Sequence, residues 1–247
     1  MSKPQYFWGN DNPEDMKLMG IAILFALTAN SITLFLFSET ITSSGPAIES
    51  GLSLDSMRGV LMVTLGWIFC FLSAMGGQIR TKMEMAENAD AEYLAKRAMY
   101  NSIEHAFPSL FMIWLAAIYC NAGAASVLGG LYVLGRLFYP ILYGWYGHFT
   151  LFVEFATQLG YFALGGLLLS LYGQVFFDDP LIAVVVQHWY MPFWLLGAWL
   201  LFSLIQINLV GFGIYFPIYK RGLDWKQRFD EYSAQNENTD HRKEQSQ

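Results

Sequence analysis

A set of polar side chains lies in or beside three successive apolar stretches between positions 77 and 143. Its members are Arg80, Arg97, Asn101, Glu104, Arg136, Tyr139 and Tyr143. Arginine binds carboxylates in bidentate fashion, a carboxylate binds an α-amino group, and tyrosine hydroxyls donate to ligands. Because ionisable groups are costly in apolar surroundings, their recurrence on neighbouring segments indicates a site. Together they match what a small zwitterionic peptide requires.

The middle stretch carries four of these positions on one helical face. Arg97, Asn101, Glu104 and Pro108 follow at i, i+4, i+7 and i+11. Glu104 would lie about two turns inside the helix, where a carboxylate needs a cation or several donors. Arg136 is the one basic residue of the next stretch, so we predict that it pairs with Glu104. The same residues could instead form a structural network that locks helices together.

The remaining sequence is typical of a polytopic membrane protein. The chain has 247 residues, 55% of them hydrophobic and 14% charged, too apolar for an ordinary soluble domain. Six stretches are long enough to span a bilayer: Leu18–Ser38, Gly59–Ile79, Ile103–Tyr119, Ala124–Trp145, Leu151–Gln174 and Ile182–Ile218. A net charge of −6 and the lack of a basic stripe argue against nucleic-acid binding. Cys70 and Cys120 fall within apolar runs and are expected to be buried thiols.

The loops predict how these stretches are arranged. A tight turn at Asn121–Gly123 should join the third and fourth as an antiparallel hairpin. With six spans, the basic residues near positions 82–97 and 220–228 fall on one side of the membrane. The positive-inside rule then places both termini in the cytoplasm, and we expect a bacterial inner-membrane protein. The segment 81–96 is long enough to extend the preceding helix at the interface.

Three motifs resemble the MAPEG superfamily, the membrane-associated proteins in eicosanoid and glutathione metabolism. They are Gly77-Gln78-Ile79-Arg80, Arg97-x-x-x-Asn101-x-x-Glu104-x-x-x-Pro108 and Gly135-Arg136-x-x-Tyr139-x-x-x-Tyr143. The resemblance is closest to the microsomal prostaglandin E synthase and microsomal glutathione transferase branch. It implies an all-α fold with a four-helix bundle at 58–173, a homotrimer, and glutathione bound by the polar set above.

Flanking this core we expect a polar segment (1–17), an extra span and loop (18–57), a second extra span (174–218) and a polar, disordered tail (219–247).

One departure from the family concerns catalysis. Active eicosanoid-type members place an arginine early in the fourth core helix, where it stabilises the glutathione thiolate. Here that region offers only His148, Thr150 and Glu154 as polar residues. We therefore take Thr150, His148 and Arg80 as candidate catalytic residues; no metal site is expected.

Two functions remain open. The first is a glutathione-dependent membrane transferase or peroxidase that acts on lipophilic electrophiles. The second is a non-catalytic auxiliary or scaffold subunit of a larger membrane complex, which the added spans would favour.

Overall fold

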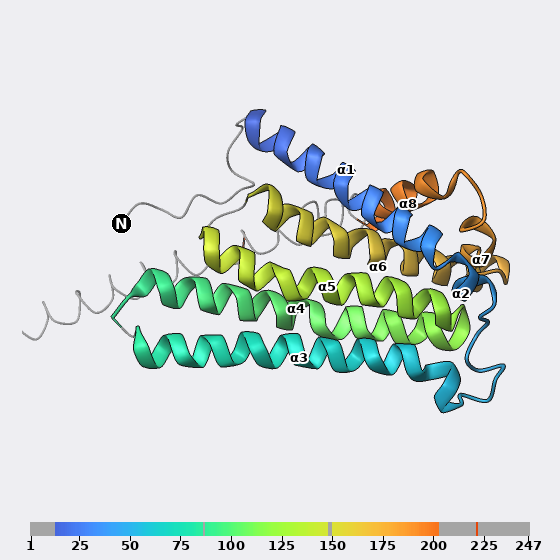
Figure 1. Ribbon diagram of the computed structural model, residues 1–247, viewed down its shortest axis with the longest axis horizontal. Coiled ribbons are helices and arrows are strands. Elements are labelled where there is room, and N and C mark those ends of the chain that lie inside the picture. The colour runs from blue at the N-terminus through green and yellow to red at the C-terminus, as the bar shows by residue number, and fades with distance from the viewer. Residues whose placement is uncertain (1–12, 86, 148–149, 203–220, 222–247) are drawn as a thin grey trace, which may run out of the picture. The chain divides into compact units, whose positions relative to one another are not determined.

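The computed structural model describes residues 13–85, 87–147, 150–202 and 221. The chain divides into two compact units, 1–200 and 201–247, and the second contributes only Leu201, Phe202 and Arg221 to the described residues. All regular elements of the described residues are helices (Figure 1): α1 (Pro13–Leu36), α2 (Ser38–Thr42), α3 (Leu54–Glu84), α4 (Ala89–Tyr119), α5 (Ala122–Tyr146), α6 (Leu151–Phe177), α7 (Ile182–Val185) and α8 (Met191–Leu200).

Short polar residues set the start of each core helix. The side chains of Ser53, Asn88, Asn121 and Thr150 accept hydrogen bonds from backbone N–H groups in the first turns of α3, α4, α5 and α6, respectively. Such caps satisfy donors that have no partner within the helix. They account for the boundaries better than hydropathy does, because α3 and α4 extend well beyond their apolar stretches.

The charged segment between the second and third stretches is mostly helical. Helix α3 continues to Glu84 and α4 already begins at Ala89, so the predicted extension is present and the connection is short. Two i, i+4 ion pairs support these ends, Arg80–Glu84 at 2.8 Å and Glu92–Lys96 at 2.7 Å. Arg97 and Asn101 are therefore held on a continuous helix.

Helix α5 packs against α3, α4 and α6, and α1 and α8 pack on α6 (Figure 1). Close approach of α5 to α6 requires a glycine, because a Cβ at Gly135 would lie 2.5 Å from the carbonyl oxygen of Ala156. Tyr132, Leu128 and Phe162 are fully buried between these helices. The bundle thus holds the middle of α5, where Arg136 lies, away from solvent.

The predicted hairpin between α4 and α5 is confirmed. Only Cys120 and Asn121 separate the two helices. The Asn121 amide donates to the carbonyl oxygens of Ile41 (2.9 Å) and Ser44 (2.7 Å). The N–H of Ala47 also donates to the Ala117 carbonyl at 2.9 Å. These bonds attach the segment after α1 to the core hairpin.

Among the described residues, five helices are long and apolar enough to cross a membrane: α1 from Lys17, α3, α4 from Ala91, α5 and α6. They correspond to the first five predicted spans, and the protein is an all-helical, polytopic integral membrane protein. The sixth predicted stretch contains two helices, α7 and the apolar α8, because the chain turns at residues 186–190. Its remaining part, 203–218, lies outside the described residues. Cys70 and Cys120 are buried free thiols, as predicted.

Candidate functional site

Arg136 is the most buried cation of the described bundle, with 5% of its surface exposed. Its guanidinium carbon lies 5.3 Å from the ring centroid of Tyr132 and 5.9 Å from that of Tyr139. Aromatic faces at this distance attract a cation and offset part of the cost of burying it. These neighbours, one turn before and one turn after on α5, keep the side chain against the bundle.

The guanidinium of Arg136 is only partly satisfied by the protein. Its Nη1 donates to the Oδ1 of Asn101 on α4. Its Nη2 is buried and has no hydrogen-bond partner among the described residues. Buried charged donors are costly to leave unpaired, so Nη2 is a donor available to a further acceptor.

The predicted ion pair between Glu104 and Arg136 is wrong for this chain. Glu104 is exposed on α4, and the described residues contain no ion pair between the two. The reason is the rotation of α4 about its axis: Asn101 faces α5 and contacts Arg136, whereas Glu104 lies at the exposed edge of the same broad face.

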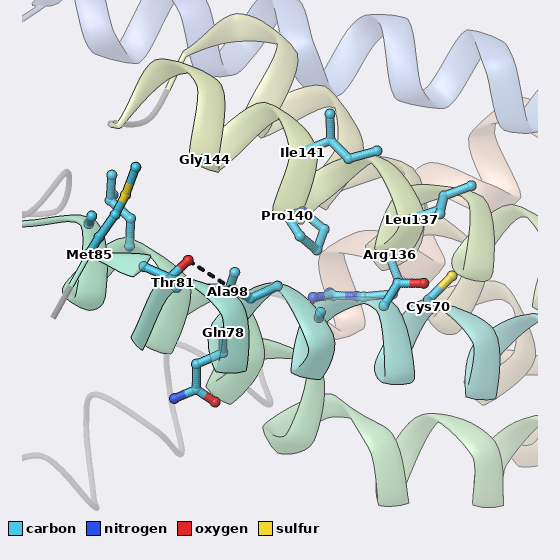
Figure 2. A pocket seen from close by; sticks show the side chains of 16 residues that line it. Cys70, Gln78, Thr81, Met85, Ala98, Arg136, Leu137, Pro140, Ile141 and Gly144 are labelled. Carbon is cyan, nitrogen blue, oxygen red and sulfur yellow. Dashed lines mark hydrogen bonds between the residues drawn. The ribbon is translucent and has the colours of Figure 1, made fainter. Parts of the chain in front are cut away.

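A pocket of about 390 Å³ lies between α3, α4 and α5 and has Arg136 in its wall. Figure 2 shows Cys70 and Arg136 at one end and Thr81 and Met85 at the other. Most of the wall is apolar, with residues such as Leu94 from α4. This size and composition are typical of a small-molecule site, in which a few polar groups fix the ligand's orientation.

Pro140 interrupts the hydrogen bonding of α5 beside the pocket. Lacking an N–H, proline cannot donate to the carbonyl four residues earlier, which is that of Arg136. Pro140 and Arg136 both line the pocket. The Arg136 carbonyl therefore lacks the intrahelical donor that a non-proline residue at position 140 would supply.

The other predicted ligand residues are not gathered in this pocket. Tyr139 and Tyr143 are buried with ring centroids 5.6 Å apart, and they pack with Val153 and Ala156 of α6. Arg80 is exposed and paired with Glu84, and Arg97 is half-buried. Within one chain, the structure joins Asn101 to Arg136 and leaves Arg80 and Glu104 on outward surfaces.

The start of α6 has no free cation among its described residues. The Thr150 hydroxyl oxygen accepts a bond from the Val153 N–H at 3.4 Å, and His148 lies outside the described residues. Glu154 is buried and accepts a bond from Gln158 at 3.3 Å. Gln158 in turn accepts one from the Trp199 indole at 2.8 Å. This polar chain links α6 to α8.

Sequence reasoning missed part of the pocket wall. Ser73, Gln78 and Thr81 line it from α3, and Gln78 is buried. Their spacing of three to five residues on an apolar helix was the available signal. Among the described residues, no cluster of three or more His, Cys, Asp or Glu side chains could hold a metal ion.

Fold and site together define a helical integral membrane protein with a core pocket, in whose wall lies an arginine with only some of its hydrogen-bond donors paired. The sequence model of the MAPEG family matches residues 57–177, which run from the first turn of α3 to the end of α6. This match supports the superfamily part of the predicted resemblance, and the branch stays a prediction. No curated protein and no solved structure matches the chain.

Proposed function

We propose that the pocket between α3, α4 and α5 binds glutathione and that the protein is a glutathione-dependent membrane transferase or peroxidase for lipophilic electrophiles. The unpartnered Nη2 of buried Arg136 carries this proposal. It supplies a charge-assisted donor for a carboxylate. MAPEG proteins generally use glutathione, and their segment here contains the whole pocket.

The remaining residues of the polar set support the site in different ways. Asn101 accepts a hydrogen bond from Nη1 of Arg136, and this contact leaves Nη2 available to a ligand. The stacked pair Tyr139 and Tyr143 fixes the α5–α6 contact behind Arg136. Glu104 and Arg80 are exposed, so they reach bound glutathione only where a neighbouring subunit covers them. Their role therefore depends on the homotrimer that the family resemblance implies.

When bound, glutathione supplies a thiol whose deprotonated form is the nucleophile. A free thiol has a pKa of about 8.5 and needs a cation nearby to ionise at neutral pH. Thr150 already caps α6 with its hydroxyl oxygen, and Arg80 is engaged with Glu84. The chain therefore binds and orients the thiol better than it activates it.

A second candidate function is a non-catalytic auxiliary subunit of a membrane complex. Two interhelical bonds favour it by joining the added segments to the last core helix. Asn30 of α1 donates to the Leu159 carbonyl at 3.3 Å, and Trp199 of α8 donates to Gln158 at 2.8 Å. These helices cover α6, the helix in which the activating arginine is missing.

A glutathione titration of the full chain in mild detergent separates the two functions. Saturable binding that is lost in Arg136→Ala and kept in Arg58→Ala supports the first. Arg58 is a matched control because it is exposed and pairs only with Asp55 at 3.1 Å. Absence of binding, together with stable co-purification of another membrane protein, supports the auxiliary role.

A further inference from the structure

Apart from Arg136, the polar side chains in the wall of the Arg136 pocket come from helix α3. Among the described residues that line the pocket, α3 contributes Ser73, Gln78 and Thr81. The lining side chains of α4 are apolar, and so are those of α5 other than Arg136. A polar ligand that is held by Arg136 must therefore find its remaining protein partners on α3.

Of the three polar residues on α3, Gln78 is the one that is both buried and unpaired. It is 8% exposed, and its side-chain amide makes no hydrogen bond within the described part of the chain. The Thr81 hydroxyl already donates to the Gly77 carbonyl at 2.9 Å (Figure 2), and Ser73 is exposed. Leaving a buried amide unpaired is costly, so Gln78 has donors and an acceptor available to a ligand.

The packing of α3 directs Gln78 towards the interior of the bundle. The buried residues before it on this helix include Val63, Trp67 and Cys70, at helical spacing. Gln78 follows Cys70 by eight residues, about two turns, and so belongs to the same face. An apolar residue fills each earlier position of this face. At residue 78 the face borders the pocket, and the chain places an amide there.

Gln78 and Arg136 lie at different levels of the pocket. Helices α3 and α5 run in the same direction (Figure 1), and the Cys70 thiol donates to the Val133 carbonyl at 3.9 Å. Arg136 comes three residues after Val133, and Gln78 comes eight residues after Cys70. The difference of five residues corresponds to about 7 Å along the helices. The two side chains are also apart in Figure 2, so they would meet different groups of one ligand.

The chemistry of the two side chains indicates what such a ligand must offer. Arginine favours a carboxylate. A carboxamide has both N–H donors and a carbonyl acceptor, which complement the C=O and N–H of a peptide group. A separation of about 7 Å corresponds to about two residues of an extended peptide. A simple carboxylic acid or a single amino acid would pair with Arg136 and leave Gln78 without a partner.

We propose that Gln78 binds a peptide group of glutathione while Arg136 binds a carboxylate of the same molecule, so that Gln78 selects a peptide over a single amino acid. This inference rests on the proposed function and adds a specificity-determining residue to it. It gives α3 a direct part in ligand binding, which Arg80, exposed and paired with Glu84, does not supply within one chain.

The test compares glutathione binding by the full chain in mild detergent with binding by Gln78→Leu. The variant should bind glutathione roughly tenfold more weakly, the loss expected for two ordinary hydrogen bonds. Its melting temperature without ligand should be unchanged or higher, because leucine removes an unpaired buried amide. Gln174→Leu is the matched control, since Gln174 lies outside the pocket and donates to Asp178 at 3.0 Å; it should keep full affinity.

Cysteine tests the selection itself, because it has a carboxylate and no peptide group. Its inhibition constant against labelled glutathione should be the same for the unaltered chain and for Gln78→Leu. An equal loss for both ligands would overturn the inference, and so would a lower melting temperature of the ligand-free variant, which would make Gln78 structural. Glutathione binding that is lost in Arg136→Ala and unchanged in Gln78→Leu would overturn the inference alone. No binding by the unaltered chain would overturn the proposed function with it.

Discussion

Asn101 on α4 accepts a hydrogen bond from Nη1 of Arg136 on α5, and Nη2 of the same guanidinium is buried with no hydrogen-bond partner in the part of the chain that the structure describes. An amide cannot neutralise the cation, so the pair positions the charge without cancelling it. An Arg–Glu pair at the same place would have satisfied both groups internally. The observed contact therefore favours a binding role for Arg136 over a purely structural one.

The first prediction concerns Arg136 itself. Arg136→Ala should weaken glutathione binding by about tenfold or more, because one charge-assisted hydrogen bond contributes roughly 1.5–3 kcal/mol. Isothermal titration of the folded variant measures this directly, with Arg58→Ala as the control. Unchanged affinity would make Arg136 a structural residue.

Asn101 should act through Arg136. Asn101→Ala leaves the buried Nη1 unpaired, so we expect both weaker glutathione binding and a lower melting temperature. Asn101→Asp should restore the melting temperature by pairing the guanidinium, while binding of an anionic ligand stays weak because the charge is now cancelled. If Asn101→Asp bound glutathione as well as the unaltered chain, the positioning role would be refuted.

Glu104 should matter between subunits and not within one. Glu104→Gln is expected to leave the melting temperature of dissociated chains unchanged, since the side chain is exposed and makes no ion pair among the described residues. If the proposed trimer places Glu104 against a neighbour, the variant should shift the oligomer distribution in size-exclusion chromatography with light scattering. A lower melting temperature of the dissociated chain would reveal an internal partner.

Membrane orientation gives a further prediction. Both termini should face the cytoplasm, because the basic residues cluster near positions 82–97 and 220–228. Reporter fusions at each end should give cytoplasmic signals, and a fusion in the connection between α2 and α3 should give the opposite signal. A terminal fusion that reports the outside would contradict the six-span topology.

The sequence predicted correctly those features of the fold that depend on a single segment of the chain. Apolar length predicted the spans, and the Asn121 turn predicted the hairpin, because both depend on local composition and turn chemistry. The i+4 and i+7 spacing placed Asn101 and Glu104 on one broad face of α4, but it could not decide which of them contacts α5. That choice depends on the rotation of α4 about its axis, which packing against three neighbours determines.

Contacts made by the added helices were also beyond sequence reasoning. The bonds from Asn30 to Leu159 and from Trp199 to Gln158 join residues far apart in the chain, and neither belongs to a motif. That Pro140 leaves the Arg136 carbonyl without an intrahelical donor follows from the sequence alone. That Arg136 and Pro140 line the same pocket appears only in the structure.

The last prediction concerns the thiol of bound glutathione. Near the start of α6, the described polar groups are Thr150, which caps the helix, and the buried acid Glu154. A hydroxyl stabilises a thiolate less than a permanent cation, and a carboxylate opposes it. The pKa of the bound thiol should therefore stay near the free value of about 8.5, and turnover of an activated aryl halide should be slow. Thiolate absorbance during a pH titration measures the pKa of the bound thiol.

Introducing a cation into the pocket makes this prediction sharper. An Ala91→Arg variant adds a cation to the wall of the Arg136 pocket and leaves the Thr150 cap in place. It should lower the pKa of the bound thiol and raise turnover, whereas Ala91→Leu should change neither. If the unaltered chain already shows a thiol pKa near 6, another cation must activate the thiol, and Arg80 of a neighbouring subunit would be the first residue to replace.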